Sequence, residues 1–365
     1  MRVVIACGGT GGHIYPGLAV AEALRGRDPS TDVLFIGSGG LASRIIPTAG
    51  WPMQQVASRQ LTRRVSWRAP WAVLVAVFGM IQAIRWLLAF RPGVVLCTGG
   101  YAAAPVGAAA ALLRMPLVLQ EQNLHPGMAN RLLQRFARVI SVPHESVARE
   151  FGAKAVVTGV PVGRSAVGGD RARGRQRFGL DPARTTILVL GGSQGARRIN
   201  EAMVEAAPHL ANPDALQIVH QTGQAHEAWV RARVAQLGAL AYVVVGYIDD
   251  VADAYACADL VVCRAGASTL AEVTAHGLPC IAVPYPYAAE GHQEANARLH
   301  ERAGAAVVIL DRELSGEGLA ALLNRLRGDP ATLRAMAASS RRLGRSEAAA
   351  EVAALVTSAA DKERM

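Results

Sequence analysis

The sequence lacks acidic residues over a long stretch: none occurs between Val33 and Gln120, where there are eight arginines. Residues 1–163 hold 16 Lys and Arg against 6 Asp and Glu, whereas residues 164–365 hold 22 of each. The net charge of +10 therefore belongs to the first half. A basic half predicts an anionic partner: a nucleic acid, a phospholipid surface or a phosphorylated substrate.

Cysteine is sparse as well. The chain has no C-x-x-C pair, and its five cysteines lie in apolar runs: Cys7, Cys97, Cys257, Cys263 and Cys280. This pattern predicts buried, reduced thiols of a cytoplasmic protein, and it argues against a disulfide framework or a zinc site. We expect no signal peptide, because Met1-Arg2 passes directly into a strand-like run. A hydrophobic content of 51% with 18% charge excludes a disordered chain.

Aromatic residues make up only 5% of the chain, and no RNP-like, helix-turn-helix or zinc-finger pattern occurs. We therefore predict no nucleic-acid partner, despite the basic first half.

The apolar run of residues 71–90 is interrupted by only two polar residues, Gln82 and Arg85. The run has the length of a membrane span, but an arginine inside a membrane costs roughly 2.5–3.5 kcal/mol. Because a doubly wound domain needs a helix here, we predict no span.

Basic and aromatic residues interleave just before this run. The side chains concerned are Arg59, Arg63, Arg64, Trp67, Arg68 and Trp71. Tryptophan rings lie at headgroup depth in membranes, and arginines bind anionic lipid. The pattern predicts a peripheral membrane patch; the alternative is a fully buried helix.

Two halves of the chain repeat one arrangement, in which a short apolar run meets a glycine-rich loop and then a helical stretch. Residues 3–7 meet Gly8-Gly9-Thr10-Gly11-Gly12, and residues 187–190 meet Gly191-Gly192-Ser193-Gln194-Gly195. Further strand-like runs follow at residues 32–36, 94–97, 117–119, 216–220, 260–263 and 280–283. Strands alternating with helices predict an α/β protein with two doubly wound, parallel-sheet domains.

The domains are expected to span residues 1–163 and 164–344, with a junction near residues 160–163. The alanine-rich tail has apolar residues at helical spacing, at Ala349, Val352, Ala353 and Val356. It predicts a helix over about residues 345–362, which packs either on the second domain or back on the first.

Glycines between a strand and a helix let the backbone approach a phosphate, and the helix N-terminus offers N–H groups and a positive dipole end. Two such loops, with Cys97-Thr98-Gly99-Gly100-Tyr101, predict a phosphate-bearing ligand. An NAD site needs an acid after its second strand, but Ser38 and Thr222 stand near those ends. The lysine of a P-loop is replaced by His13 and Ala196. NAD and P-loop ATP chemistry are therefore excluded.

A third segment, residues 259–272, indicates a strand, a turn of small residues and a helix start. Ser268 and Thr269 are expected to cap the helix, with a diphosphate against its N–H groups. Glu272, one turn further, is placed to accept hydrogen bonds from a ribose. The alternative is an ordinary capped helix with an acid in its first turn.

The chain carries these motifs in order: Gly8-Gly9-Thr10-Gly11-Gly12-His13, Glu121-Gln122-Asn123, Gly191-Gly192-Ser193-Gln194-Gly195-Ala196, Ile248-Asp249-Asp250, Arg264-Ala265-Gly266-Ala267, Glu272, and His292-Gln293 with Asn296-Ala297. Together they resemble the MurG glycosyltransferases of peptidoglycan synthesis. The resemblance implies the GT-B fold, two Rossmann-like domains facing a cleft. It also implies inverting transfer of N-acetylglucosamine (GlcNAc) from UDP-GlcNAc to the C4 hydroxyl of the muramyl sugar of lipid I, giving lipid II, without metal or cofactor.

The same resemblance implies binding roles at matching positions. On the acceptor side it implies Thr10, Gly11 and Gly12, near the donor diphosphate. For the donor it implies Asn123 at the sugar, Gln293 at the GlcNAc hydroxyls, Ile248 at the uracil through its backbone, and Ser193, Ala267, Ser268, Thr269, Leu270, Ala271 and Glu272 at the diphosphate and ribose. Near the domain junction the family commonly reads G-N-P-x-R. Here the arginine falls one place later, at Arg164, which is the residue expected to reach a phosphate.

Inverting transfer needs a base for the attacking hydroxyl. His13 is the candidate, because a neutral imidazole titrates near the working pH. The alternative is that His13 only caps or orients its loop, in which case Glu121 is next in line.

Two rival enzymes share this architecture, a UDP-GlcNAc 2-epimerase and a diacylglycerol glycosyltransferase; a non-catalytic nucleotide-sugar module is a third alternative. The partners implied by the resemblance are UDP-GlcNAc, the polyprenyl-diphosphate acceptor lipid I, an anionic membrane surface and proteins of cell-wall synthesis. The implied location is the cytoplasmic face of the inner membrane, with a part in cell shape and division.

Overall fold

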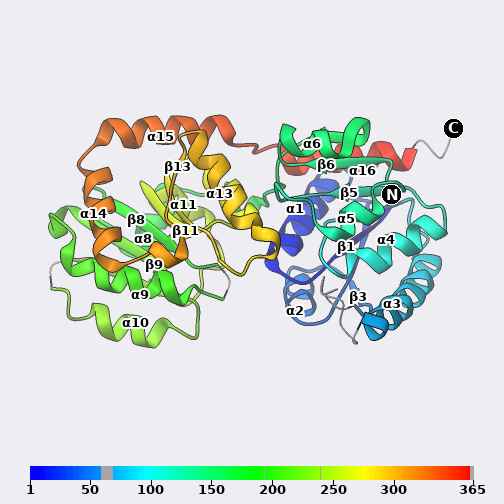
Figure 1. Ribbon diagram of the computed structural model, residues 1–365, viewed down its shortest axis with the longest axis horizontal. Coiled ribbons are helices and arrows are strands. Elements are labelled where there is room, and N and C mark those ends of the chain that lie inside the picture. The colour runs from blue at the N-terminus through cyan, green and yellow to red at the C-terminus, as the bar shows by residue number, and fades with distance from the viewer. Residues whose placement is uncertain (59–68, 193, 239, 362–365) are drawn as a thin grey trace. The chain divides into compact units, whose positions relative to one another are not determined.

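The computed structural model describes residues 1–58, 69–192, 194–238 and 240–361. The chain divides into two compact units (Figure 1). Unit 1 comprises Met1–Gly163 together with Arg345–Met365, and unit 2 comprises Arg164–Gly344. Each unit is a parallel sheet with helices between its strands, which confirms the predicted α/β class of two Rossmann-like domains.

Unit 1 holds a seven-stranded sheet in the order β3-β2-β1-β4-β5-β6-β7, and the pairing is parallel throughout. The strands are β1 (Arg2–Cys7), β2 (Asp32–Gly37), β3 (Met53–Gln55), β4 (Val94–Cys97), β5 (Leu117–Gln120), β6 (Val139–Val142) and β7 (Ala155–Val157). The strand order reverses between β1 and β4. Ligands of open α/β sheets bind at such a switch point, outside the carboxyl ends of the strands.

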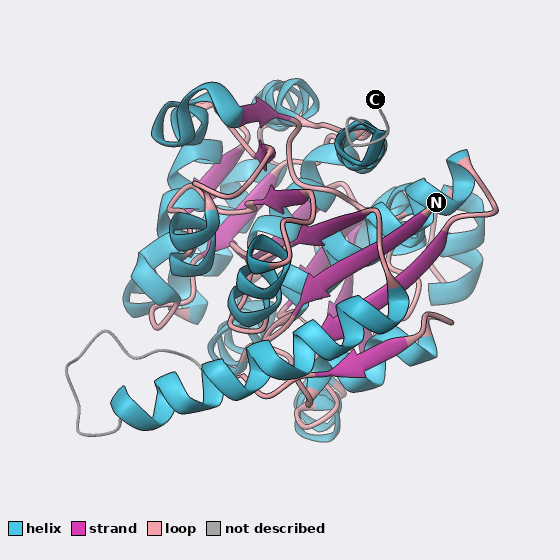
Figure 2. Ribbon diagram, turned by 90° about the vertical axis from the view of Figure 1, so that its right-hand side faces the viewer, coloured by secondary structure: helices cyan, strands magenta, loops and turns pink. Residues whose placement is uncertain are grey.

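Helices cover both faces of this sheet (Figure 2). They are α1 (Gly11–Arg27), α2 (Leu41–Thr48), α3 (Ala69–Phe90), α4 (Ala103–Leu112), α5 (Met128–Leu133), α6 (Glu145–Phe151) and the C-terminal α16 (Ala348–Asp361). Val352 and Val356 of α16 are buried in one cluster with Val3 and Ile5 of β1. The tail helix therefore packs on unit 1, beside α1 (Figure 1).

Unit 2 holds a six-stranded parallel sheet in the order β10-β9-β8-β11-β12-β13. Its strands are β8 (Thr185–Leu190), β9 (Leu216–Gln221), β10 (Ala241–Val245), β11 (Leu260–Arg264), β12 (Cys280–Val283) and β13 (Ala306–Val308). Its helices are α7 (Arg164–Val167), α8 (Arg171–Phe178), α9 (Arg197–Ala206), α10 (Glu227–Val234), α11 (Ala252–Cys257), α12 (Ala267–Ala275), α13 (His292–Arg302), α14 (Gly316–Arg327) and α15 (Pro330–Leu343). The strand order of this sheet reverses between β8 and β11, and this is its switch point.

All five cysteines are buried and none forms a disulfide, as predicted. Burial raises the pKa of the Cys7 and Cys97 thiols to about 12. Both therefore stay protonated and serve as small apolar side chains in two separate core clusters of unit 1.

Helix α3 contains the apolar run and follows the grey segment in Figure 2. Among the described residues, no helix is both long enough and apolar enough to cross a membrane. One side of α3 is buried through Ala83 and Leu87. The opposite side is not, so a fully buried helix is the wrong alternative: the exposed fractions are 60% for Leu74, 44% for Val77, 56% for Phe78, 57% for Ile81 and 53% for Leu88. Arg59, Arg63, Arg64, Trp67 and Arg68 lie outside the described residues, as does the side chain of Trp71.

Candidate functional site

The first glycine loop joins β1 to α1. Gly9 has a φ of +90°, and a Cβ there would lie 2.7 Å from the ring of Tyr101, so only glycine fits. Thr10 occupies the N-cap position with extended backbone, and its side chain makes no capping hydrogen bond. Gly11 and Gly12 therefore present the first N–H groups of α1, which have no acceptor within the helix. Such an N-terminus suits an anionic ligand.

His13 lies in the first turn of α1, and its ring is oriented by the end of β4. Its Nδ1 lies 3.0 Å from the carbonyl oxygen of Thr98, which only accepts hydrogen bonds. In the neutral ring Nδ1 therefore carries the proton, and Nε2 holds the basic lone pair. Gly99 keeps this approach open, since a Cβ there would lie 2.9 Å from Nδ1. His13 does not cap the helix, because Thr10 occupies that position.

Glu121 is buried at the end of β5, and donors surround its carboxylate. Oε1 accepts from the backbone N–H groups of Gln122 and Asn123, both at 3.0 Å. Oε2 accepts from the N–H of Gly127 at 2.9 Å and from Nδ2 of Asn130 at 2.8 Å. Both oxygens of this buried carboxylate are engaged by groups of the loop, so the side chain has the geometry of a loop anchor. The geometry therefore favours His13 over Glu121 as the base.

The first glycine loop, through His13, and the loop after β5, through Gln122, both contact the carbonyl oxygen of Thr98. The Nε2 of Gln122 donates to the oxygen of Thr98, which also accepts from His13. It donates as well to Oε1 of Gln120, at 2.7 Å. The structure thus brings His13 and the loop bearing Asn123 together, beyond the carboxyl ends of β1, β4 and β5.

The second glycine loop joins β8 to α9 in unit 2. Gly192 and Gly195 have φ values of +82° and +78°. A Cβ on Gly195 would lie 2.0 Å from the carbonyl oxygen of Thr222, so this loop rests directly on the end of β9. Ser193, predicted to bind the diphosphate, lies outside the described residues.

The contact between the second glycine loop and Thr222 is supported by a series of buried hydrogen bonds through Asn200, His220 and Tyr242, which sequence analysis missed. Nδ2 of Asn200 donates to the oxygen of Thr222 at 2.8 Å, and its Oδ1 lies 3.0 Å from Nε2 of His220. Nδ1 of His220 lies 2.8 Å from the hydroxyl of Tyr242. Burial lowers the pKa of His220 to about 3, so the ring is neutral. It therefore donates through Nε2 and accepts from Tyr242 through Nδ1, which fixes the Asn200 amide under the loop.

Ile248 is tied to the same loop through Gln221. Oε1 of Gln221 accepts from the N–H of Ile248 at 3.0 Å, and its Nε2 donates to the oxygen of Gly192 at 3.1 Å. The Ile248 side chain is buried. Since its N–H is engaged, the backbone group of Ile248 suited to a base edge is its carbonyl.

Helix α12 begins at Ala267, with Gly266 in the N-cap position. The prediction that Ser268 and Thr269 cap this helix is wrong, because the extended backbone of Gly266 takes that position and moves both residues into the first turn. The hydroxyl oxygen of Ser268 is buried, with no hydrogen-bond partner among the described residues. Such an atom costs free energy unless water or a ligand satisfies it. Leu270 and Ala271 follow in the helix, and the side chain of Leu270 is buried in the core.

Glu272 lies in the second turn of α12, and its Oε2 accepts from the hydroxyl of Tyr255 at 2.9 Å. Burial raises the pKa of Glu272 from its ordinary 4.5 to about 7. A ligand hydroxyl that donates to this carboxylate would favour the charged form. Binding of such a ligand near neutral pH therefore releases a proton.

Glu272→Gln is expected to stabilise the unliganded protein at alkaline pH and not at acid pH. Between about pH 4.5 and 7 the native state keeps a proton that the unfolded chain has lost, so stability falls as the pH rises through this window. The loss above pH 7 is on the order of 2–3 kcal/mol. Thermal unfolding of both proteins at several pH values measures it. Equal midpoint differences at pH 5 and pH 8 would contradict the assignment.

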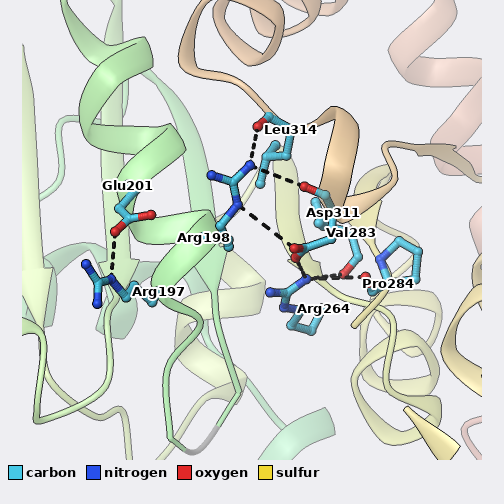
Figure 3. A network of polar contacts seen from close by, with 8 residues as sticks. All are labelled: Arg197, Arg198, Glu201, Arg264, Val283, Pro284, Asp311 and Leu314. Carbon is cyan, nitrogen blue, oxygen red and sulfur yellow. Dashed lines mark hydrogen bonds and ion pairs between the residues drawn. The ribbon is translucent and has the colours of Figure 1, made fainter. Parts of the chain in front are cut away.

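An ion-pair network lies at the carboxyl ends of β11 and β12 (Figure 3). The guanidinium of Arg264 binds the carboxylate of Asp311 and donates to the carbonyls of Val283 and Pro284, both at 3.3 Å. Arg198 of α9 also reaches Asp311, at 3.9 Å. The side chains of Arg264 and Asp311 are only 12% and 14% exposed. The network therefore joins α9 to the ends of two central strands.

Two predicted residues lie elsewhere in unit 2. Gln293 is in the first turn of α13, and its Oε1 accepts from the N–H of Tyr285 at 2.9 Å. Arg164 is the first residue of α7. Within the described parts of the chain, no group of three or more His, Cys, Asp and Glu side chains is arranged to hold a metal ion.

The comparisons with known proteins agree with each other. The model of the glycosyltransferase family 28 N-terminal domain matches residues 3–142, and that of the C-terminal domain matches residues 186–354. A relative from Halothermothrix orenii is 42% identical, covers 94% of this chain and 95% of its own, and is named UDP-N-acetylglucosamine–N-acetylmuramyl-(pentapeptide) pyrophosphoryl-undecaprenol N-acetylglucosamine transferase.

Two solved structures resemble this chain. MurG of Acinetobacter baumannii has a TM-score of 0.77 and 31% identity, over 98% of this chain and 100% of that one. A putative UDP-N-acetylglucosamine 2-epimerase from Listeria monocytogenes has a TM-score of 0.67 and 15% identity, over 98% and 96%, and shares the fold alone. Given the two family models and the relatives matched over nearly the whole length, the chain belongs to glycosyltransferase family 28, with the GT-B fold, among the MurG N-acetylglucosaminyltransferases.

Proposed function

We propose that this protein transfers GlcNAc from UDP-GlcNAc to the C4 hydroxyl of the muramyl sugar of lipid I, with inversion, and so forms lipid II for peptidoglycan. One observation carries the proposal: eight relatives bearing the name of this transferase are 38–43% identical over 94–100% of the chain. The role makes the protein part of cell-wall growth, and through it of cell shape and division.

Unit 2 is the donor domain in this proposal. The diphosphate of UDP-GlcNAc lies against the second glycine loop with Ser193, and against the start of α12. There it gives a hydrogen-bond partner to the hydroxyl of Ser268, which has none among the described residues. The free backbone N–H groups of the same helix start are those of Ala267, Ser268 and Thr269, because the N–H of Leu270 already donates to the oxygen of Gly266 at 2.9 Å. Leu270 and Ala271 are assigned to this site on the family pattern alone. Helix dipoles and N–H groups of this kind stabilise a departing diphosphate without a metal. Arg164 is assigned to a phosphate on the family pattern alone.

The nucleoside and the donor sugar contact the neighbouring segments. The carbonyl of Ile248 accepts from the uracil ring, and Glu272 accepts from the ribose hydroxyls. Gln293 and Asn123 hold the hydroxyls of the GlcNAc. The assignment is supported by how these segments are held. Gln221 accepts from the backbone N–H of Ile248, and Glu121 accepts from the backbone N–H of Asn123. The Glu272 carboxylate accepts from the hydroxyl of Tyr255.

Unit 1 supplies the acceptor side and the base. Thr10, Gly11 and Gly12 lie at the start of α1, where an acceptor diphosphate would meet the N–H groups of the helix. His13 follows them, and its Nε2 takes the proton of the C4 hydroxyl as that oxygen attacks the anomeric carbon. The bond from this carbon to the UDP oxygen breaks on the opposite face, which inverts the configuration. The Thr98 carbonyl stabilises the resulting imidazolium through Nδ1.

The assay that tests the function measures UDP release from UDP-GlcNAc in EDTA, with a lipid I analogue present, absent or replaced by diacylglycerol. Release only with the analogue supports the proposal and a metal-independent mechanism. Release only with diacylglycerol would assign the chain to glycolipid synthesis. Turnover of UDP-GlcNAc without any acceptor would favour a 2-epimerase.

We further propose that the exposed side of α3, formed by Leu74, Val77, Phe78, Ile81 and Leu88, binds the anionic inner membrane at its cytoplasmic face. The positive charge of the first half of the chain and the polyprenyl tail of lipid I support this location. Proteins of cell-wall synthesis are expected to meet the enzyme there.

Phe78→Ser combined with Ile81→Ser is expected to weaken binding to phosphatidylglycerol vesicles at low salt by at least about tenfold. Both side chains are more than half exposed, so their loss leaves the core intact. Vesicle sedimentation measures the change, and Val156→Ser, at an exposed position of β7, is the control. Failure of the unmodified protein to bind these vesicles would contradict the proposal.

A further inference from the structure

The exposed large apolar side chains are distributed unevenly between the units. Of the eleven among the described residues, nine belong to unit 1, and the two in unit 2 are Tyr285 and Tyr287, which are 44% and 83% exposed. They lie on one loop, between β12 and α13, with ring centroids 5.6 Å apart at 71°. Edge-to-face tyrosines of this kind form a small aromatic surface.

The loop is firmly held at its base. The N–H of Tyr285 donates to Oε1 of Gln293 at 2.9 Å, and the N–H of Ala288 donates to the oxygen of Tyr285 at 3.2 Å. The guanidinium of Arg264 lies 5.5 Å from the ring centroid of Tyr285, and the same group binds Asp311 and the Pro284 carbonyl. The ring of Tyr285 is thus fixed on the network of Figure 3, and it supports Tyr287 from the side.

The loop also borders the proposed donor site. Arg264 pairs with Val283 in the register of β11 and β12, so the ends of these two strands are adjacent. β11 leads into α12, which carries Ser268 and Glu272, and β12 leads into the tyrosine loop. The loop therefore follows the strand next to the diphosphate segment, and it is hydrogen-bonded to Gln293.

Neither the core nor a membrane accounts for the exposure of these rings. Tyr287 is too exposed to contribute to a core. The loop, residues 284–291, contains no lysine or arginine, and its one charged residue is Glu290. An anionic lipid surface is recognised by clustered basic residues, which this loop lacks.

We propose that Tyr287, supported by Tyr285, packs flat against a pyranose ring of the substrate and determines which sugar is accepted. The proposal rests on the proposed function. A tyrosine ring offers an apolar face and a polar tip, which matches the C–H face and the hydroxyl rim of an amino sugar. The ring belongs either to the GlcNAc of the donor or to the muramyl sugar of the acceptor, and kinetics separate the two.

The test compares Tyr287→Ala and Tyr287→Phe with the unmodified enzyme, using UDP-GlcNAc and a soluble lipid I analogue. Tyr287→Ala is expected to raise one KM about tenfold, the size of a lost aromatic contact. Tyr287→Phe, which keeps the ring face, is expected to recover most of this loss. An increase in the KM of UDP-GlcNAc with unchanged inhibition by UDP assigns the ring to the donor sugar. An increase only in the KM of the analogue assigns it to the acceptor.

Other results overturn the proposal. Unchanged KM values in Tyr287→Ala would show that no sugar binds there. An equal loss of affinity for UDP would show that the loop only supports the nucleotide site, and a loss of vesicle binding would show a lipid contact. Val156→Ala, an exposed position in unit 1, is the control for general effects. If the unmodified enzyme does not turn over the lipid I analogue, the proposed function is wrong. The donor contact is then still tested by comparing the affinities of the unmodified protein and of both variants for UDP-GlcNAc with their affinities for UDP.

Discussion

Replacement of His13 by alanine is expected to lower kcat by about 10²–10⁴-fold, while the affinity for UDP stays the same. The reason is the tautomer fixed by Thr98: its carbonyl holds the proton on Nδ1 and leaves Nε2 as the basic nitrogen. In the proposed function UDP binds to unit 2, which contains neither residue. Steady-state rates with UDP-GlcNAc and a lipid I analogue, together with calorimetric titration of UDP, measure the two quantities.

His13→Asn separates the base from an orienting role. The side-chain amide of asparagine can donate to the Thr98 carbonyl much as Nδ1 does, but it has no basic nitrogen. We therefore expect the asparagine variant to be as impaired as the alanine variant. Recovery of most of the activity in His13→Asn would contradict a base and leave only the contact with Thr98.

The glycine loops and most central strands could be predicted because their signals are local. A β-branched run followed by glycines that need positive φ, as at Gly9 and Gly195, determines its own backbone. Five strands were missed. Of these, β3, β7 and β13 are three residues long, too short to show a period. The other two, β6 and β10, are apolar runs of four and five residues whose signal is as local as that of the predicted strands. The tail helix was predicted, but its choice between the units depends on packing with β1, which no local pattern reveals.

Groups that act through distant partners were the ones that sequence could not identify. Arg264 and its partner Asp311 are 47 positions apart in the sequence. His220 lies 20 positions from its partner Asn200 and 22 from its partner Tyr242. Only the fold brings these polar groups together. The misplaced cap at Ser268 has a local cause, since sequence rules favour Ser at the N-cap but accept Gly there too.

Glu121→Gln provides the sharpest contrast with His13, because the two residues were rivals for one role. An amide replaces one carboxylate oxygen with an NH₂ group, which then faces N–H donors on whichever side it lies. At least two hydrogen bonds to a charged group are lost, which costs roughly 3 kcal/mol or more. We expect a lower unfolding midpoint, faster amide exchange at Asn123 and Gly127, and kcat/KM reduced by about 100-fold.

The coupling of these changes is what distinguishes a loop anchor from a base. A general base replaced by its amide would lose kcat while the unfolding midpoint and the exchange rates stayed the same. Glu145→Gln, at an exposed glutamate in the first turn of α6, controls for the loss of one negative charge and is expected to change none of the three. If Glu121→Gln lowers kcat alone, the proton acceptor is Glu121 and the fixed tautomer of His13 only positions the β4 end. If all three change together, the carboxylate shapes the loop that presents Asn123, and the basic nitrogen of the site is Nε2 of His13.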